Sequence, residues 1–291
     1  MPKVVKALCD ALSLAVRPIS ANASFFFFMY ALGCVSSWAV LPDSRGAKVY
    51  DNLYLELLLD TYVVCIVLSI LPLVVRRWVR GLLYVALYAT SVIDVYCFVK
   101  FQSTLTPSML MLVGETDPRE AGEFLRSCVS PGVITSSVGW VLLLLIVHVL
   151  TALRLKFPHI IPHHIEQKLC KIGRQTAAFA SRSMTKAVTG LVIVVMGIWA
   201  AVVAADNKQA TWKLMSGTNI GEVEHTLTEQ GHAQLYLPAY RLVFSVYANS
   251  LAAKQIDKLI AGIDKVKVDS CSYKSPTIVL IIGESYSRHH S

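Results

Sequence analysis

Long apolar runs alternate with short polar segments along most of this chain, and these runs predict its architecture. Five of them approach the roughly 20 residues that a helix needs to cross a hydrocarbon core. They cover about residues 20–42, 53–75, 81–100, 132–153 and 187–205. We therefore predict a five-helix transmembrane domain over residues 1–205. A polar, mixed segment follows at 206–275, and a strand-like apolar run opens the last part, 276–291.

The composition agrees with a membrane protein. Of the 291 residues, 55% are hydrophobic and only 16% are charged, whereas about a quarter of the residues in soluble domains are charged. The net charge is +8, but nothing resembles an aromatic-rich RNA platform or a recognition helix, so nucleic acid is not an expected partner. The seven cysteines are scattered without a CxxC pair, which argues against a disulfide framework or a zinc knuckle.

The distribution of basic residues predicts the orientation. The loop RRWVR, residues 76–80, separates the second and third runs, and seven basic residues lie between the fourth and fifth, over 154–186. The positive-inside rule places both loops and the N-terminus in the cytoplasm. Residues 1–18 are then an amphipathic segment before the first span rather than a cleaved signal peptide, because Asp10 interrupts their apolar stretch. Five spans put everything after Ala205 outside.

The segment 206–275 is expected to contain short helices or amphipathic pieces. Its stretch YLPAYRLVFSVY, residues 236–247, has an aromatic and apolar face with one arginine. Such a face can lie along a membrane surface or pack on other helices as a connector. We favour the connector, because simple amphipathic faces are common.

Three carboxylates lie inside predicted spans. Glu56 and Asp60 are one turn apart in the second span, and Asp94 lies in the third. Acids within a membrane are costly and are by default functional candidates. The alternative is that each acid pairs with a partner on another helix.

Residues 106–127, TPSMLMLVGETDPREAGEFLRS, follow the third run and carry an acidic, hydroxyl-bearing pattern. Glu115, Thr116, Glu120 and Glu123 could form a rim just outside the bilayer that holds a cationic headgroup such as an amine. The alternative is ordinary helix capping and solvation at the start of a helix.

The last apolar run, IVLII at 278–282, suits a strand buried on both faces of a parallel α/β sheet. Ligands bind at the C-terminal ends of such strands, and Gly283 and Glu284 stand at that end. Glu284 is therefore a candidate ligand for a divalent cation. The alternative is a solvated loop acid.

The motif VGETDPREAGEFL, between the third and fourth of five predicted spans, and the motif IVLIIGESYSRHHS, behind the fifth, resemble the membrane-bound phosphoethanolamine transferases. That family joins an α-helical membrane domain to a periplasmic α/β domain with a sulfatase-like, alkaline phosphatase superfamily fold. The resemblance covers nearly all of the membrane part but only the first strand and turn of the catalytic domain. It implies that residues 276–291 begin a truncated catalytic domain.

The resemblance also implies roles for single residues. Glu284 would be the first ligand of a Zn²⁺ ion. Thr116 and Glu120, with Glu115, would hold the phosphoethanolamine headgroup, although Leu112 stands where some members carry an Asn.

The nucleophile implied by the resemblance is a Thr expected beyond Ser291, so no catalytic residue is assigned within this chain, and Ser285 is not taken as the nucleophile. We expect the isolated 291 residues to be inactive.

The implied activity transfers phosphoethanolamine from phosphatidylethanolamine to a lipid A or lipooligosaccharide-core glycan acceptor. The protein would be a multi-pass protein of the bacterial inner membrane, with a cytoplasmic N-terminus and a periplasmic C-terminus. Two alternatives stay open. One is a related phosphoglycerol transferase or sulfatase-like hydrolase, and the other is a non-catalytic membrane module.

Overall fold

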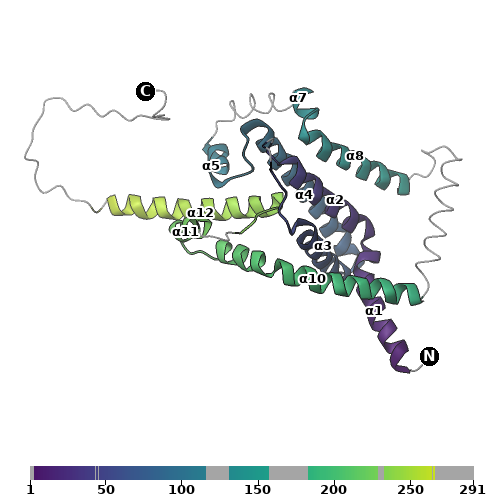
Figure 1. The fold of residues 1–291 in the computed structure, drawn as a ribbon. Helices are drawn as coiled ribbons and strands as arrows, with labels where there is room; N and C mark the ends of the chain where they lie inside the picture. The colour runs from purple at the N-terminus through teal and green to yellow at the C-terminus, as the bar shows by residue number, and fades with distance from the viewer. Residues whose placement is uncertain are drawn as a thin grey trace, which may run out of the picture. The chain divides into compact units, whose positions relative to one another are not determined.

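The computed structural model describes residues 3–42, 44, 46–115, 131–156, 183–228, 233–263 and 265. Within these ranges the chain is mostly helical and contains no strand (Figure 1). The helices are α1 (Lys3–Ala21), α2 (Ala23–Ala39), α3 (Leu53–Ile70), α4 (Leu73–Phe101), α5 (Pro107–Glu115), α7 (Pro131–Ile134), α8 (Ser137–Lys156), α10 (Ser183–Met215), α11 (Ile220–Thr228) and α12 (Pro238–Ile263). The chain forms two compact units, Met1–Ala252 and Ala253–Ser291.

Several helices are long and apolar enough to cross a membrane. Three qualify singly within the described ranges, Leu53–Ile70, Leu73–Phe101 and Met184–Met215, and α1 with α2 qualifies as a pair bent by 72°. The predicted fourth span lies on α8, whose apolar part Ser137–Leu153 is shorter. The structure thus supports three or four spans, and the count of five stays a prediction.

The exposed surfaces of these helices are apolar, as expected for helices that face lipid. On α10, Ile198, Trp199 and Val202 are all more than half exposed. Only 22% of the most apolar stretch of this helix is buried. In water so large an apolar surface would be a liability, whereas in lipid it costs nothing.

The loop RRWVR predicted between the second and third spans is instead helical. Leu71 is extended, with ψ 144°, because the ring of Pro72 disfavours a helical conformation in the residue before it. Helix α3 therefore ends at Ile70, and α4 begins at Leu73. The basic stretch 76–80 forms early turns of α4 rather than a connection, and the second span ends sooner than predicted.

Arg76 closes the break between α3 and α4. Its Nη2 donates to the carbonyl oxygens of Leu71, at 3.1 Å, and Ser69, at 3.4 Å. The last carbonyl groups of a helix have no partner within that helix, so this side chain satisfies groups that the break leaves open.

The fifth predicted span is only part of a longer helix. Helix α10 continues from the apolar run past Ala205 to Met215, because residues 206–215 contain no glycine or proline to stop it. The segment expected as a connector thus begins inside a helix. Further on, the stretch 236–247, which was expected to be amphipathic, leads into the single 26-residue helix α12.

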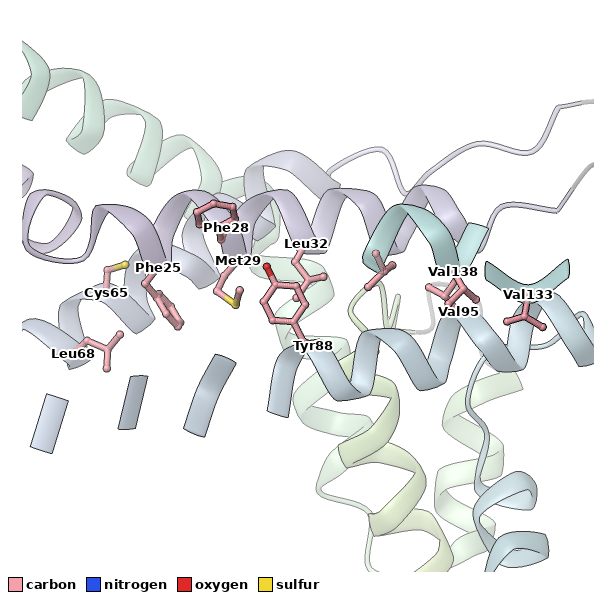
Figure 2. Close-up of a cluster of buried hydrophobic side chains, with 11 residues drawn as sticks. Phe25, Phe28, Met29, Leu32, Cys65, Leu68, Tyr88, Val95, Val133 and Val138 are labelled. Atoms are coloured by element: carbon pink, nitrogen blue, oxygen red, sulfur yellow. The ribbon is translucent and has the colours of Figure 1, made fainter. Parts of the chain in front are cut away.

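The core within the first unit lies where α2 meets α3, α4 and α8. Its buried side chains are Phe25, Phe28, Met29, Leu32, Cys65, Leu68, Tyr88, Val95, Val133, Val138 and Val141. Figure 2 shows Met29 and Leu32 of α2 pointing toward Tyr88 of α4. His148 of α8 stacks on Phe28 at a centroid distance of 4.0 Å, and its Nδ1 lies 3.2 Å from the Tyr88 hydroxyl.

Helices α1 and α10 cross closely, and a glycine makes this possible. A Cβ atom placed on Gly190 would lie 1.9 Å from the backbone oxygen of Leu12. The buried face of α10 also carries Ala187, Ala200 and Ala204. Small residues of this kind let helix backbones approach within a membrane, where van der Waals contact drives association.

We expect Gly190→Ala to separate α1 from α10 and to lower the thermal stability of the chain in detergent micelles. Gly197→Ala on the same helix is the matched control, because nothing lies within 4 Å of its Cβ position. The Gly197→Ala substitution should leave the stability of the helix unchanged or slightly raised, since alanine favours a helix over glycine by about 1 kcal/mol. Equal melting temperatures for the two variants would contradict the crossing.

Candidate functional site

Three acids of the predicted spans, Glu56, Asp60 and Asp94, have their polar partners on or beside one short stretch that leads into α12. This stretch, residues 233–241, is named here the docking segment. It contacts α2, α3, α4 and α10 through side-chain hydrogen bonds and ion pairs. All of these contacts lie within the unit Met1–Ala252.

The first connection is a bidentate ion pair between α4 and α12. Nη2 of Arg241 lies 2.7 Å from Oδ2 of Asp94, and Nε donates to Oδ1 at 3.0 Å. The Asp94 side chain is fully buried, and that of Arg241 is 12% exposed. The backbone N–H of Leu105 also donates to Oδ1, at 2.9 Å, while Nη1 of Arg241 donates to the Leu235 oxygen. Such a fork-shaped pair fixes direction as well as distance.

The second connection surrounds Asp60 with donors. Nζ of Lys208, on α10, lies 2.8 Å from each carboxylate oxygen of Asp60. The hydroxyl groups of Tyr236 and Tyr240 both donate to Oδ2, the latter at 2.6 Å. The ammonium group of Lys208 also lies over both tyrosine rings, 5.4 and 4.9 Å from their centroids, where cation–π attraction adds to the ion pair.

The two tyrosines keep their protons in this setting. Burial raises the pKa of the Tyr236 hydroxyl, and the negative charge of Asp60 raises it further. The same two causes, in the same order, raise the pKa of Tyr240. Both hydroxyl groups therefore act as hydrogen-bond donors to Asp60 rather than as bases.

The third connection runs through Asn207 to Glu56. The backbone N–H of Gln234 donates to Oδ1 of Asn207 at 2.7 Å, and Nδ2 of Asn207 donates to Oε2 of Glu56 at 2.8 Å. Glu56 is fully buried. The amide thus links an acid of α3 to the backbone of the docking segment.

Weaker contacts complete the attachment. Oγ of Ser37, on α2, donates to the Tyr236 oxygen at 3.1 Å. The rings of Tyr50 and Tyr236 stack with centroids 5.8 Å apart. The docking segment is therefore held by groups from every neighbouring span and has one defined position.

The structure answers the question that the sequence left open for two of the acids. Asp60 and Asp94 pair with cations on other helices, so their observed role is to hold α12 on the membrane helices. Glu56 differs, because it meets an amide rather than a cation.

The structure does not describe the predicted headgroup and metal residues. Glu115 is the last residue of α5, and its side chain, with Thr116, Glu120, Glu284 and the strand 278–282, lies outside the described residues. Those assignments stay predictions. Within the described ranges, no group of three or more His, Cys, Asp or Glu could hold a metal ion.

Sequence reasoning missed Asn207, Lys208 and Tyr236. The first two follow directly after an apolar run, where polar residues are ordinary interfacial groups. One signal was present, since Glu56 and Asp60 share a helix face and two polar residues, Asn207 and Lys208, follow one another just beyond the apolar run of α10. That signal required knowing that α10 does not stop at Ala205.

Comparison with known proteins gives no assignment: no protein-family model, curated protein or solved structure matches the chain.

Replacing Arg241 by methionine should leave the Asp94 carboxylate buried without its cation. Loss of one partner of a buried pair costs about 3 to 5 kcal/mol, and equilibrium unfolding in detergent would measure this. The double variant Asp94→Leu with Arg241→Met should recover most of the loss, because apolar replacement of both partners is often neutral. Arg77→Met, at an exposed position, is the control. A double variant as unstable as Arg241→Met would contradict the pairing.

Proposed function

We propose that the chain forms the membrane part of a phosphoethanolamine transferase of the bacterial inner membrane. The donor would be phosphatidylethanolamine and the acceptor lipid A or a core glycan. The proposal rests on the motifs VGETDPREAGEFL and IVLIIGESYSRHHS together with helices suited to a membrane. The enzyme class comes from the motifs.

The observation that carries the proposal is the way the docking segment is fixed. A buried ion pair, a partly buried ion pair and an amide bridge tie it to α3, α4 and α10. A membrane anchor can be joined to the following domain by a flexible linker. An enzyme that acts on a lipid headgroup instead needs its following domain to be held at a fixed distance from the membrane surface. Holding reactants in position can supply several kcal/mol of a reaction barrier.

The orientation proposed from the basic residues agrees with this arrangement. Glu56 and Asp60 lie near the start of α3, Asp94 lies near the end of α4, and Lys208 lies near the end of α10. The Arg-rich stretch 76–80 is at the opposite end of α4. Placing that stretch in the cytoplasm therefore puts the docking segment on the outer side.

The proposed chemistry divides between two sets of residues. Carboxylates of Glu115 and Glu120 would pair with the ammonium group of the headgroup, and the Thr116 hydroxyl would donate to its phosphate. Glu284 would be one oxygen ligand of a Zn²⁺ ion, which stabilises charge on phosphoryl oxygens when bound. A Thr nucleophile of this family would form the covalent intermediate that splits the transfer into two steps.

Lipid selection by the chain itself tests the headgroup assignment. We expect the protein, purified from mixed vesicles, to retain phosphatidylethanolamine over phosphatidylglycerol by about ten-fold, because a charge-assisted pair contributes roughly 1.5 to 3 kcal/mol. Native mass spectrometry would count the bound lipids. Thr116→Val and Glu120→Gln should abolish the preference, and Asp10→Asn, an exposed acid of α1, should keep it.

Two other results would each overturn the proposal in a distinct way. Preference for phosphatidylglycerol would favour a phosphoglycerol transferase. Equal retention of both lipids, unchanged in the variants, would favour a non-catalytic membrane module.

The metal assignment needs a separate test in an active full-length transferase that contains this segment. Glu284→Ala should abolish zinc-dependent transfer of phosphoethanolamine to the acceptor glycolipid, measured by mass spectrometry. Ser285→Ala is the matched control and should retain activity, since Ser285 is adjacent but is not assigned as a nucleophile. Near-normal transfer by Glu284→Ala would remove Glu284 from the ligand set.

A further inference from the structure

Glu56 differs from Asp60 and Asp94, the other acids at the docking segment, because none of the described cationic side chains forms an ion pair with it. Both oxygens of Asp60 are taken by Lys208, and both oxygens of Asp94 face Arg241. With all five groups ionised, the two pairs would be neutral and Glu56 would leave one uncompensated negative charge. Glu56 itself has no solvent exposure.

The hydrogen bonds of Glu56 satisfy only one of its oxygens. Nδ2 of Asn207 donates to Oε2, and the orientation of that amide is forced, because the backbone N–H of Gln234 requires Oδ1 as its acceptor. Oε1 is buried and has no hydrogen-bond partner among the described residues. The neighbouring Tyr50 hydroxyl interacts with the carboxyl group without meeting hydrogen-bond geometry to this oxygen.

The described residues around Glu56 include no second cation. On α3 the nearest ionisable group is Asp60, and on α10 the neighbours are Asn207, Lys208 and the exposed Asp206. The docking segment contributes Tyr236 and Tyr240. The remaining titratable groups packed around Leu53 and Leu57 are Tyr30, Cys34 and Tyr50. Lys208 is the one cation among these groups, and Asp60 binds it.

An ionised carboxylate in this position would be expensive. A buried charge without a partner costs several kcal/mol, and carboxyl groups so placed avoid the cost by becoming neutral. The occupant must also be very small, because Oε1 has essentially no exposed surface. A metal ion or an ammonium group would have to displace the side chains that cover Oε1, whereas a proton requires no space.

We propose that Glu56 is a proton-binding site that is occupied at neutral pH, and that its proton is a condition for the docking segment to occupy its position on α3 and α10. The protonated carboxyl group accepts from Asn207 through Oε2 and carries the proton on Oε1. Loss of this proton places a second negative charge one helical turn from Asp60, next to the segment that Asn207 holds. The inference rests on the described contacts and not on the proposed transferase activity.

Infrared spectroscopy of the whole chain in lipid nanodiscs tests the occupancy directly. At neutral pH we expect the absorption of one protonated carboxyl group, shifted by exchange into D₂O, to be lost in Glu56→Gln. Asp206→Asn is the control, an exposed acid one residue from Asn207, and its spectrum should keep that band. If Glu56→Gln loses only carboxylate absorption, Glu56 is ionised and the proposal is wrong.

Limited proteolysis tests the coupling to docking. Trypsin cuts after Arg241 only when the Asp94 pair opens, and cleavage after the exposed Lys254 normalises for the effect of pH on the protease. In the wild-type chain the cleavage ratio should rise with pH by up to about ten-fold per unit beyond the midpoint. In Glu56→Gln, a neutral isostere, the ratio should stay within two-fold of the wild-type value at neutral pH and show no such rise.

Three outcomes of this experiment would overturn the coupling. They are a wild-type ratio that does not change with pH, the same rise in Glu56→Gln as in the wild type, and a Glu56→Gln chain that is undocked or unfolded at neutral pH while Asp206→Asn is folded. The last result would mean that the negative charge of Glu56, rather than its neutral form, stabilises the docked state.

Discussion

The ion pair between Asp94 and Arg241 connects the membrane helices to the docking segment. Asp94 is fully buried on α4, and a charge there is tolerable only with a partner. Arg241 provides that partner near the start of α12 and uses a third nitrogen to bind the Leu235 oxygen. Because a buried negative charge needs a cationic partner, α4 and α12 must meet at this point. The docking segment is fixed as a consequence.

The remaining polar groups follow from the same constraint. Lys208 lies near the end of α10 and neutralises Asp60, while Asn207 reaches Glu56 from the adjacent position. These contacts need α10 to continue past its apolar stretch. They also need α10 close to α1 and α3, which the small residues on its buried face allow. The close helix packing that Gly190 allows thus supports the ion pair of Lys208 with Asp60, several turns further along α10.

Much of the local structure could be predicted from the sequence, and the errors have physical causes. The apolar runs indicated the membrane helices, but α3 ends earlier than predicted because Pro72 excludes helical geometry from Leu71. Helix α10 ends later, because no residue in 206–215 breaks it. The headgroup residues Glu115, Thr116 and Glu120 and the metal ligand Glu284 were predicted from motifs, and their side chains lie outside the described residues.

The sequence by itself determined that the chain has helices long and apolar enough to cross a membrane, because this property depends on the length and composition of each run and not on its partners. It also identified Glu56, Asp60 and Asp94 as acids in costly positions. Only the tertiary structure decided which of them are neutralised by cations and which is not. Which residues pair depends on the spatial distances between helices that are far apart in the sequence. Asp94 and Arg241, for example, are separated by 147 residues, and no local sequence pattern encodes their contact.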